Sequence, residues 1–129
     1  MINEIFNIYN KVDHQFMIIK VTKLLRNLKI KDQDNIIIII SELSTNILKY
    51  ANKGKIKLEL SNKLIKIISL DDGDGIENIE LALKDGFTTS KSLGMGLPAI
   101  KRLSNRMEIK TSKKGTKIIV ELNLRYLSD

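Results

Sequence analysis

Residues 55–70 read KIKLELSNKLIKIISL and contain two apolar segments separated by a short polar turn. In 55–60, aliphatic and charged side chains alternate, which is the pattern of a strand with one buried face. The segment 64–70 is again rich in isoleucine and leucine, and the Ser-Asn-Lys between the two segments suits a hairpin turn. The sequence therefore predicts two neighbouring antiparallel strands in the middle of the chain.

A further strand is expected at the start of the chain, over residues 2–9. Ile2, Phe6 and Ile8 fall on one face of an extended segment, and Ile5 falls on the opposite face. The spacing therefore favours a strand whose apolar residues are concentrated on one side.

Between this strand and the hairpin, a helix is expected over residues 13–28. Asp13 is its predicted N-cap, since a carboxylate there can accept a free backbone N–H group. The side chains that recur near the helical period are Phe16, Ile19, Lys20, Lys23, Leu24 and Leu28. We expect these side chains to lie along one face of the helix.

The next segment, 32–51, contains an unbroken isoleucine run at 36–40. Such β-branched residues favour a strand locally, because they lose rotamer freedom in a helix. The segment nevertheless continues with apolar residues beyond the run, Asp32 or Asp34 can cap a helix at its start, and Gly54 follows its end. We therefore expect a buried helix over 32–51, which Gly54 stops.

The last third of the chain alternates loops with short elements. In order, these are a Gly/Asp-rich loop over 71–76, a helix over 77–84, a loop over 85–96, a helix over 97–106, and paired strands over 107–111 and 117–124. Strands around a few helices, with two antiparallel hairpins, indicate an α+β fold. We expect a two-layer α/β sandwich, in which helices cover one face of a mixed, mostly antiparallel sheet. Residues 1–129 are expected to form a single domain.

Composition excludes several kinds of site. Cysteine is absent, which removes disulfides, zinc–thiolate sites and thiol nucleophiles, and His14 is the single histidine. The net charge is +7, yet only 5% of residues are aromatic and no basic–aromatic alternation suggests a base-stacking surface. The aliphatic run at 36–40 is too short to cross a bilayer. We therefore expect a soluble cytoplasmic protein that binds neither nucleic acid nor a membrane.

Three clusters of polar residues or glycines could carry chemistry. In the first, Glu42 and Asn46 are four residues apart and so share one face of the predicted helix. A carboxylate and an amide oxygen presented together can serve as a base and as a ligand for a hard cation. Taken alone, a Glu/Asn pair of this kind is more often a surface pair with no chemical role.

The second cluster is the loop Asp71-Asp-Gly-Asp-Gly-Ile76, which follows a predicted strand directly. Aligned as a calcium-binding loop, with Gly75 at the sixth position, it lacks the carboxylates needed at both ends. It is therefore either an ordinary acidic turn or a loop whose glycines let the backbone approach a ligand closely.

The third cluster, Gly94-Met-Gly-Leu-Pro-Ala99, opens a helix. It formally matches a dinucleotide-binding pattern, but no predicted strand precedes it as that pattern requires. Free N–H groups at a helix start can bind phosphate, and Lys101 and Arg102 lie one turn further on. The sequence contains no P-loop motif, which excludes that type of phosphate site.

In this order along the chain, the three clusters and a final Gly-Thr turn resemble the GHKL superfamily of ATP-binding proteins. Within it, the chain resembles the small anti-sigma-type serine/threonine kinases of the RsbT type. The resemblance rests on Ser41-Glu-Leu-Ser-Thr-Asn-Ile-Leu-Lys-Tyr-Ala51, on 71–76 and on Asp85-Gly-Phe-Thr-Thr-Ser-Lys-Ser-Leu-Gly-Met-Gly-Leu-Pro-Ala-Ile-Lys-Arg-Leu103. It covers roughly residues 10–124 and implies the fold of histidine-kinase-type ATPases.

The resemblance implies a role for each matching position. Glu42 would be the general base that takes a proton from a substrate hydroxyl, and Asn46 would hold Mg²⁺. Asp71 would accept a hydrogen bond from the adenine amino group of ATP, while Asp72 and Asp74 add negative charge to the adenine loop. The other positions implied to contact the nucleotide are Gly73, Gly75, Ile76, Thr88, Thr89, Ser90, Gly94, Met95, Gly96, Leu97, Lys101 and Thr116. Residues 86–93 would form a lid over the triphosphate.

Phosphoryl transfer suits such a site, because it depends on positioning and charge neutralisation more than on covalent chemistry. The resemblance implies an ATP-dependent serine/threonine kinase that phosphorylates a STAS-domain antagonist protein in a bacterial partner-switching pathway. It also implies a PP2C-type phosphatase as a further partner. Two alternatives stay open: an RsbW-type anti-sigma factor kinase that sequesters a sigma factor, and a non-catalytic ATP-gated module that binds proteins.

Overall fold

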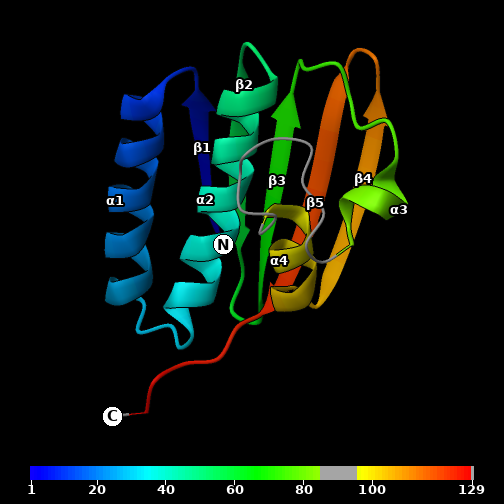
Figure 1. Ribbon diagram of the computed structural model, residues 1–129. Coiled ribbons are helices and arrows are strands. Elements are labelled where there is room, and N and C mark those ends of the chain that lie inside the picture. The colour runs from blue at the N-terminus through cyan, green and yellow to red at the C-terminus, as the bar shows by residue number, and fades with distance from the viewer. Residues whose placement is uncertain (85–95, 129) are drawn as a thin grey trace.

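The computed structural model describes residues 1–84 and 96–128, which form a sheet covered on one face by helices (Figure 1). Along the chain the elements are β1 (Ile2–Ile8), α1 (Lys11–Asn27), α2 (Gln33–Tyr50), β2 (Gly54–Leu60), β3 (Leu64–Asp71), α3 (Ile79–Ala82), α4 (Gly96–Leu103), β4 (Arg106–Ser112) and β5 (Gly115–Asn123). The strands lie in the order β1-β2-β3-β5-β4. The predicted two-layer α+β sandwich is therefore confirmed.

The expectation of a mixed sheet is wrong for the strands that the structure describes, because each neighbouring pair is antiparallel. Two of these four pairs are hairpins, β2–β3 and β4–β5. In the predicted β2–β3 hairpin, the Ser61 amide donates to the Leu64 carbonyl at 2.9 Å, and the Ser61 hydroxyl accepts from the Leu64 amide at 3.2 Å. In the second hairpin, β4 and β5 meet at Ser112 and Gly115, and β5 then pairs with β3 on its other side.

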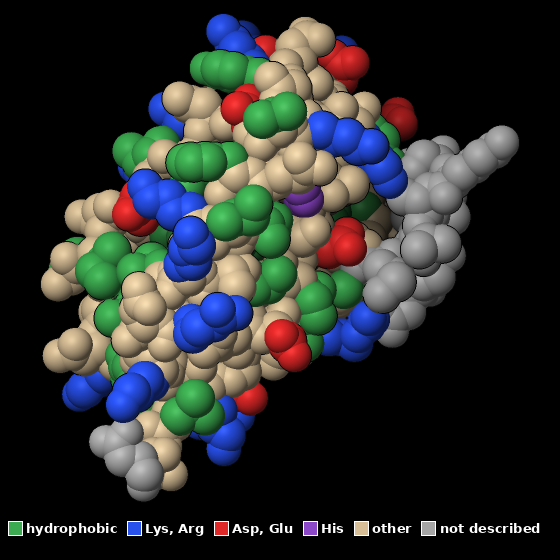
Figure 2. All heavy atoms as spheres, turned by 90° about the vertical axis from the view of Figure 1, so that its left-hand side faces the viewer, with side chains coloured by type: hydrophobic (Ala, Val, Ile, Leu, Met, Phe, Trp, Pro, Cys, Tyr) green, Lys and Arg blue, Asp and Glu red, His purple; other side chains and the backbone are tan. Residues whose placement is uncertain are grey.

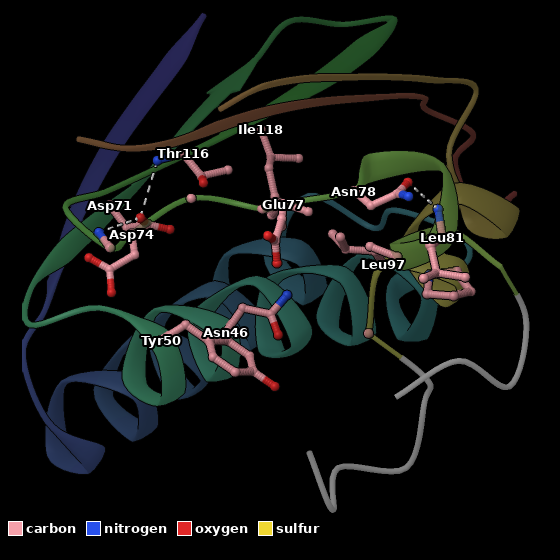
Figure 3. Close-up of a pocket in the computed structure, with 16 residues that line it drawn as sticks. Asn46, Tyr50, Asp71, Asp74, Glu77, Asn78, Leu81, Leu97, Thr116 and Ile118 are labelled. Carbon is pink, nitrogen blue, oxygen red and sulfur yellow. Dashed lines mark hydrogen bonds between the residues drawn. The ribbon is translucent and has the colours of Figure 1, made fainter. Parts of the chain in front are cut away.

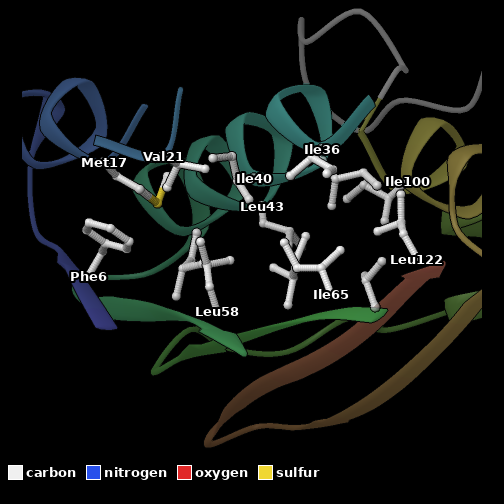
Figure 4. Packing of buried hydrophobic residues seen from close by; sticks show 14 of the residues in the cluster. Phe6, Met17, Val21, Ile36, Ile40, Leu43, Leu58, Ile65, Ile100 and Leu122 are labelled. Atoms are coloured by element: carbon white, nitrogen blue, oxygen red, sulfur yellow. The ribbon is translucent and has the colours of Figure 1, made fainter. Parts of the chain in front are cut away.

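The hydrophobic core lies between the sheet and the helices (Figure 4). The isoleucine run contributes to it directly, since Ile36, Ile39 and Ile40 are at most 2% exposed, whereas Ile38 is 41% exposed. Burying one such side chain contributes roughly 2 kcal/mol. Placing isoleucine in a helix costs only about 0.5 kcal/mol of propensity. Burial therefore outweighs local preference, and the predicted buried helix is confirmed as α2.

The start of α1 differs from the prediction. Asn10, not Asp13, is the N-cap: its side-chain oxygen accepts the Asp13 amide at 3.0 Å. Asp13 Oδ2 in turn accepts the Tyr9 amide at 2.8 Å, so the two side chains satisfy backbone donors reciprocally. The predicted cap, Asp13, is the residue of this pair that lies inside the helix.

The predicted face of α1 is only partly right: Leu24 and Leu28 of the predicted set pack against the core, but its other apolar members do not. Met17, Val21 and Leu25 are fully buried, whereas Phe16 and Ile19 are 59% and 58% exposed. The helix carries two apolar stripes on opposite sides, and the sequence pattern alone did not distinguish which one packs on the sheet.

Four further predictions at element boundaries need correction. Asp32 precedes α2 but makes no capping bond, and it pairs instead with Arg125. Gly54 does not stop α2, which ends at Tyr50; it begins β2, where a Cβ would lie 2.6 Å from the Leu70 carbonyl oxygen. The predicted helices 77–84 and 97–106 are shorter, as α3 and α4. In particular, α4 does not extend to residue 106, because the chain has already entered β4 at Arg106. In the described parts of the chain, no helix combines the length and the apolar character needed to cross a membrane.

Candidate active site

A cavity of about 570 Å³ lies between α2, the loop after β3, α3 and the first turn of α4 (Figure 3). Its size is within the usual range for pockets that hold small molecules. Of the predicted site residues, it brings together Asn46, Asp71, Gly73, Gly75, Ile76, Gly96, Leu97 and Thr116. The three sequence clusters and the Gly-Thr turn therefore meet in space, although they are spread over the chain.

Asp71, the last residue of β3, presents a fixed acceptor to this cavity. Its Oδ1 accepts the Gly73 amide at 2.9 Å and the Thr116 amide at 3.2 Å, the latter from the neighbouring strand β5. Among the described residues, Oδ2 accepts no hydrogen bond, and Asp71 lines the cavity wall. Two backbone donors thus orient the carboxylate and leave one oxygen for a ligand.

The glycines of the loop are required by close contacts with the protein's own backbone. A Cβ at Gly73 would lie 2.5 Å from the Tyr50 carbonyl oxygen, where α2 ends. Gly75 has a φ of +89°, and a Cβ there would lie 2.2 Å from the Ser112 carbonyl oxygen at the end of β4. Because L-residues avoid this φ and the contacts are shorter than van der Waals separations, only glycine fits without distortion.

Thr111 and Thr116 hold the loop from the sheet side. The Thr111 hydroxyl accepts the Ile76 amide at 2.8 Å and lies 2.8 Å from the Thr116 hydroxyl, which is buried. The two threonines are opposite each other in the β4–β5 register. Sequence analysis identified Thr116 but missed Thr111, which its own predicted hairpin could have placed beside Thr116.

Glu42 and Asn46 meet the start of α4. A methyl group added at Gly96 would lie 3.6 Å from Asn46 Oδ1 and 3.7 Å from Glu42 Oε2, so both side chains reach this helix end. Pro98 lies in the first turn of α4, where its missing N–H group removes no hydrogen bond. The side chains of Glu42 and Asn46 on α2 therefore face the same space as the N–H groups at the start of α4.

The acidic residues of the loop have different environments. Asp72 Oδ1 accepts the amides of Asn52 and Lys53, both at 3.0 Å, and ties the loop to the connection between α2 and β2. The backbone hydrogen bond from Lys53 is the main reason that the pKa of Asp72 is lowered. Asp74 instead lines the cavity, as does Glu77 (Figure 3). Asp74 and Glu77 therefore add negative charge to the cavity wall beside that of Asp71, whereas Asp72 does not line the cavity.

Some predicted residues are elsewhere. Lys101 lines a smaller cavity of about 310 Å³ beneath α3, with Ile79, Leu83, Met107 and Ile109, and does not line the first cavity. The predicted lid at 86–93, which contains Thr88, Thr89 and Ser90, lies outside the described residues. So do Gly94 and Met95, which follow it.

Sequence analysis missed several residues of the cavity wall. They are Tyr50, Glu77, Asn78, Leu81, Ala82, Pro98 and Ile118. Tyr50 could have been found, because it lies four residues after Asn46 and so one turn further along the same face of the helix.

A magnesium ion would have few protein ligands here. Among the described residues, no three His, Cys, Asp or Glu side chains are grouped to hold a metal. Asn46 offers one amide oxygen to the cavity. Magnesium keeps several waters and takes much of its coordination from substrate phosphates, so a single amide oxygen is compatible with its chemistry when a nucleotide is bound.

Comparisons with known proteins agree with this arrangement. Residues 31–126 match the family described as histidine kinase-, DNA gyrase B-, and HSP90-like ATPase. The chain is 44% identical over 92 residues to the serine/threonine-protein kinase RsbT of Bacillus subtilis, covering 67% of this chain and 69% of that protein. It is 30% identical over 109 residues to the anti-sigma F factor of Clostridium acetobutylicum, covering 78% of this chain and 76% of that protein.

Solved structures support the fold. A mycobacterial sensor histidine kinase, MprB, superimposes with a TM-score of 0.60 at 15% identity, over 98% of this chain and 100% of that chain. The catalytic domain of the histidine kinase ThkA superimposes with a TM-score of 0.57 at 18% identity, over 93% of this chain and 95% of that chain. With the family match over residues 31–126, these findings show that the chain belongs to the histidine kinase-, DNA gyrase B- and HSP90-like ATPase family, the GHKL superfamily.

Proposed function

We propose that the chain is a cytoplasmic, ATP-dependent serine/threonine protein kinase that phosphorylates a STAS-domain antagonist protein in a partner-switching pathway. The similarity to the RsbT kinase supports the reaction class. One structural observation carries the proposal: the cavity has an oriented carboxylate acceptor, Asp71, in the loop after β3, and a helix start flanked by Glu42 and Asn46 at α4.

The nucleotide would lie along the cavity. In Figure 3, Asp71 and Leu97 lie toward opposite ends, with Asn46 across from them on α2. The free Oδ2 of Asp71 would accept the adenine amino group, because it is the unused oxygen of an otherwise satisfied carboxylate. The N–H groups at the start of α4 would receive the phosphates, since the positive end of a helix dipole favours anions.

Two side chains of α2 would then act on the transferred group. Glu42 would take the proton from the attacking serine or threonine hydroxyl as the hydroxyl oxygen bonds to the γ-phosphorus. The bond from the γ-phosphorus to the bridging oxygen breaks in the same step, and ADP leaves with that oxygen. Asn46 would hold Mg²⁺ through its amide oxygen, and the ion would neutralise phosphate charge during the transfer. Both side chains lie close to Gly96, so the base and the metal ligand are near the phosphate end.

Label transfer from γ-labelled ATP to a STAS-domain protein tests the proposal. Glu42→Gln should lower the transfer rate by about 10²- to 10⁴-fold, while calorimetry finds ATP binding retained. Glu59→Gln, the same change on β2, is the matched control and should leave the rate unchanged. A Glu42→Gln variant that transfers label at the normal rate would contradict the assignment of the base. Absence of ATP binding by the folded wild-type protein would contradict the function.

The anti-sigma F factor relatives favour a second candidate, a kinase that also sequesters a sigma factor. Purification from native cells separates the two proposals. A sigma factor bound stoichiometrically supports the second candidate, whereas a STAS-domain protein or a PP2C-type phosphatase supports the first. ATP binding without label transfer to any of these partners would instead support a non-catalytic, ATP-gated binding module.

A further inference from the structure

The outer side of α1 carries a stripe of exposed apolar side chains. Val12, Phe16 and Ile19 are 70%, 59% and 58% exposed, and their spacing of four and three residues places them on one face of the helix. We call these three residues the outer stripe. The opposite face of α1, at Met17 and Val21, is fully buried against the core. A helix that is apolar on two opposite faces is typical of one that is buried on both sides.

The central residue of the outer stripe is held in position. The Phe16 ring packs edge-on against Phe6, with ring centroids 6.4 Å apart, and Phe6 belongs to the core. The Lys20 ammonium lies 6.0 Å from the Phe16 ring and 3.5 Å from a carboxylate oxygen of Glu4. Because its ring is already oriented, Phe16 would lose little conformational freedom when a partner covers it.

The charge next to the outer stripe is basic. Lys20, Lys23 and Arg26 follow it along α1 and are exposed, and Figure 2 shows apolar and basic side chains on the side of the molecule that α1 occupies. The single acidic residue of α1 is Asp13, which accepts the Tyr9 amide at the start of the helix. This surface is therefore complementary to an apolar segment that also carries negative charge.

These observations identify the kind of partner. A second copy of the chain would bring the same basic residues and a further net charge of +7 to the interface, which disfavours self-association. We propose that the outer stripe docks an amphipathic helix of another protein, with the acidic residues of that helix against Lys23 and Arg26. The docking mode is that of an amphipathic helix on an apolar surface, with anchors at helical spacing.

This surface is separate from the proposed nucleotide site. α1 packs against α2, which in turn packs against α4 at the cavity (Figure 1). None of the residues of the outer stripe is among those that line the cavity. The docked helix would therefore leave the cavity accessible, and a partner could bind this protein while the proposed kinase reaction continues elsewhere.

Site-specific photo-crosslinking in native cells tests the proposal. The probe is p-benzoylphenylalanine placed at residue 19 of the full chain, with the same probe at residue 5 as control. Ile5 is a matched position, because it is 59% exposed and lies on β1 rather than on α1. We expect the crosslink from residue 19 to map to an amphipathic, net-acidic helical peptide of another protein, and the control to give none.

Two further variants sharpen the test. Lys23→Glu with Arg26→Glu should reduce the crosslink yield about tenfold, whereas the control Lys63→Glu with Lys113→Glu should not change it. Unfolding midpoints in urea check that the variants fold. Crosslinking to α1 of a second copy, to a peptide without net negative charge, or to nothing beyond the control would overturn the proposal. A dimer in sedimentation equilibrium that Ile19→Glu dissociates would overturn it in favour of self-association.

Discussion

Replacing Asp71 by asparagine separates the two roles of its side chain. One oxygen holds the loop after β3, and the other presents a hydrogen-bond acceptor to the cavity. In the wild-type structure Oδ1 accepts two backbone amides, from Gly73 and Thr116. An asparagine oxygen can accept the same two bonds, so the side chain should keep its orientation. Its Nδ2 then replaces Oδ2 at the cavity wall and turns the free acceptor into a donor.

The expected magnitudes follow from the hydrogen bonds. Stability should fall by only about 1–2 kcal/mol, because two bonds to a charged acceptor become two bonds to a neutral one. ATP affinity should fall about 10- to 150-fold, since a hydrogen bond to a charged group is worth roughly 1.5–3 kcal/mol. The donor at the cavity wall would instead suit a purine with a carbonyl at this position. The preference for ATP over inosine triphosphate should therefore shrink.

Calorimetric titration with each nucleotide in the presence of magnesium measures these effects, and urea unfolding measures the stability. Asp74→Asn is the matched control, because it removes the same charge from the same cavity wall, and Asp74 makes no hydrogen bond to another described residue. An equal loss of ATP affinity in both variants would show that charge, not the hydrogen bond of Asp71, determines binding. Normal ATP affinity in folded Asp71→Asn would refute the assignment of Asp71 altogether.

Four other changes have defined outcomes. Gly75→Ala should cost about 2 kcal/mol or more in urea unfolding, since a φ of +89° disfavours alanine and its Cβ would contact a backbone oxygen. Leu43→Ala, in the core, should cost about 3 kcal/mol in the same assay. Asn10→Ala should remove the α1 cap at a cost of about 1 kcal/mol. His14 Nδ1 lies 2.8 Å from the buried Ser44 hydroxyl, and burial lowers the His14 pKa below 6.5. The unfolded chain therefore binds the proton more readily, so stability should fall as the pH drops below about 6.5, and His14→Gln should weaken that dependence.

The sheet could be predicted from the sequence because each strand alternates between two faces. In β2 and β5 the apolar residues recur at every second position and are buried, as at Ile56, Leu58 and Val120. The face of α1 could not be predicted in this way. Both of its sides satisfy the helical period, and only packing on β1 and α2 selects Met17 over Phe16 for burial.

The candidate site likewise contains residues that could be predicted from the sequence and residues that could not. Asp71 and Thr116 could be identified because they belong to short, recognisable sequence clusters. Residues such as Asn78 and Leu81 reach the cavity only because α3 begins beside the loop after β3. Such residues depend on how elements meet in space, which no local spacing expresses.

The Gly/Asp loop is recognisable in the sequence because the fold itself requires it. Its glycines pass within contact distance of the backbone at Tyr50 and Ser112, and Asp72 binds the connection between α2 and β2. Each of these contacts joins the loop to a different element, so the loop fixes α2 and the β4–β5 hairpin relative to β3. A change at these positions should therefore alter stability even without nucleotide. Asp71→Asn should instead mainly lower ATP affinity. This difference distinguishes the residues that maintain the structure of the cavity from the residue proposed to bind the nucleotide in it.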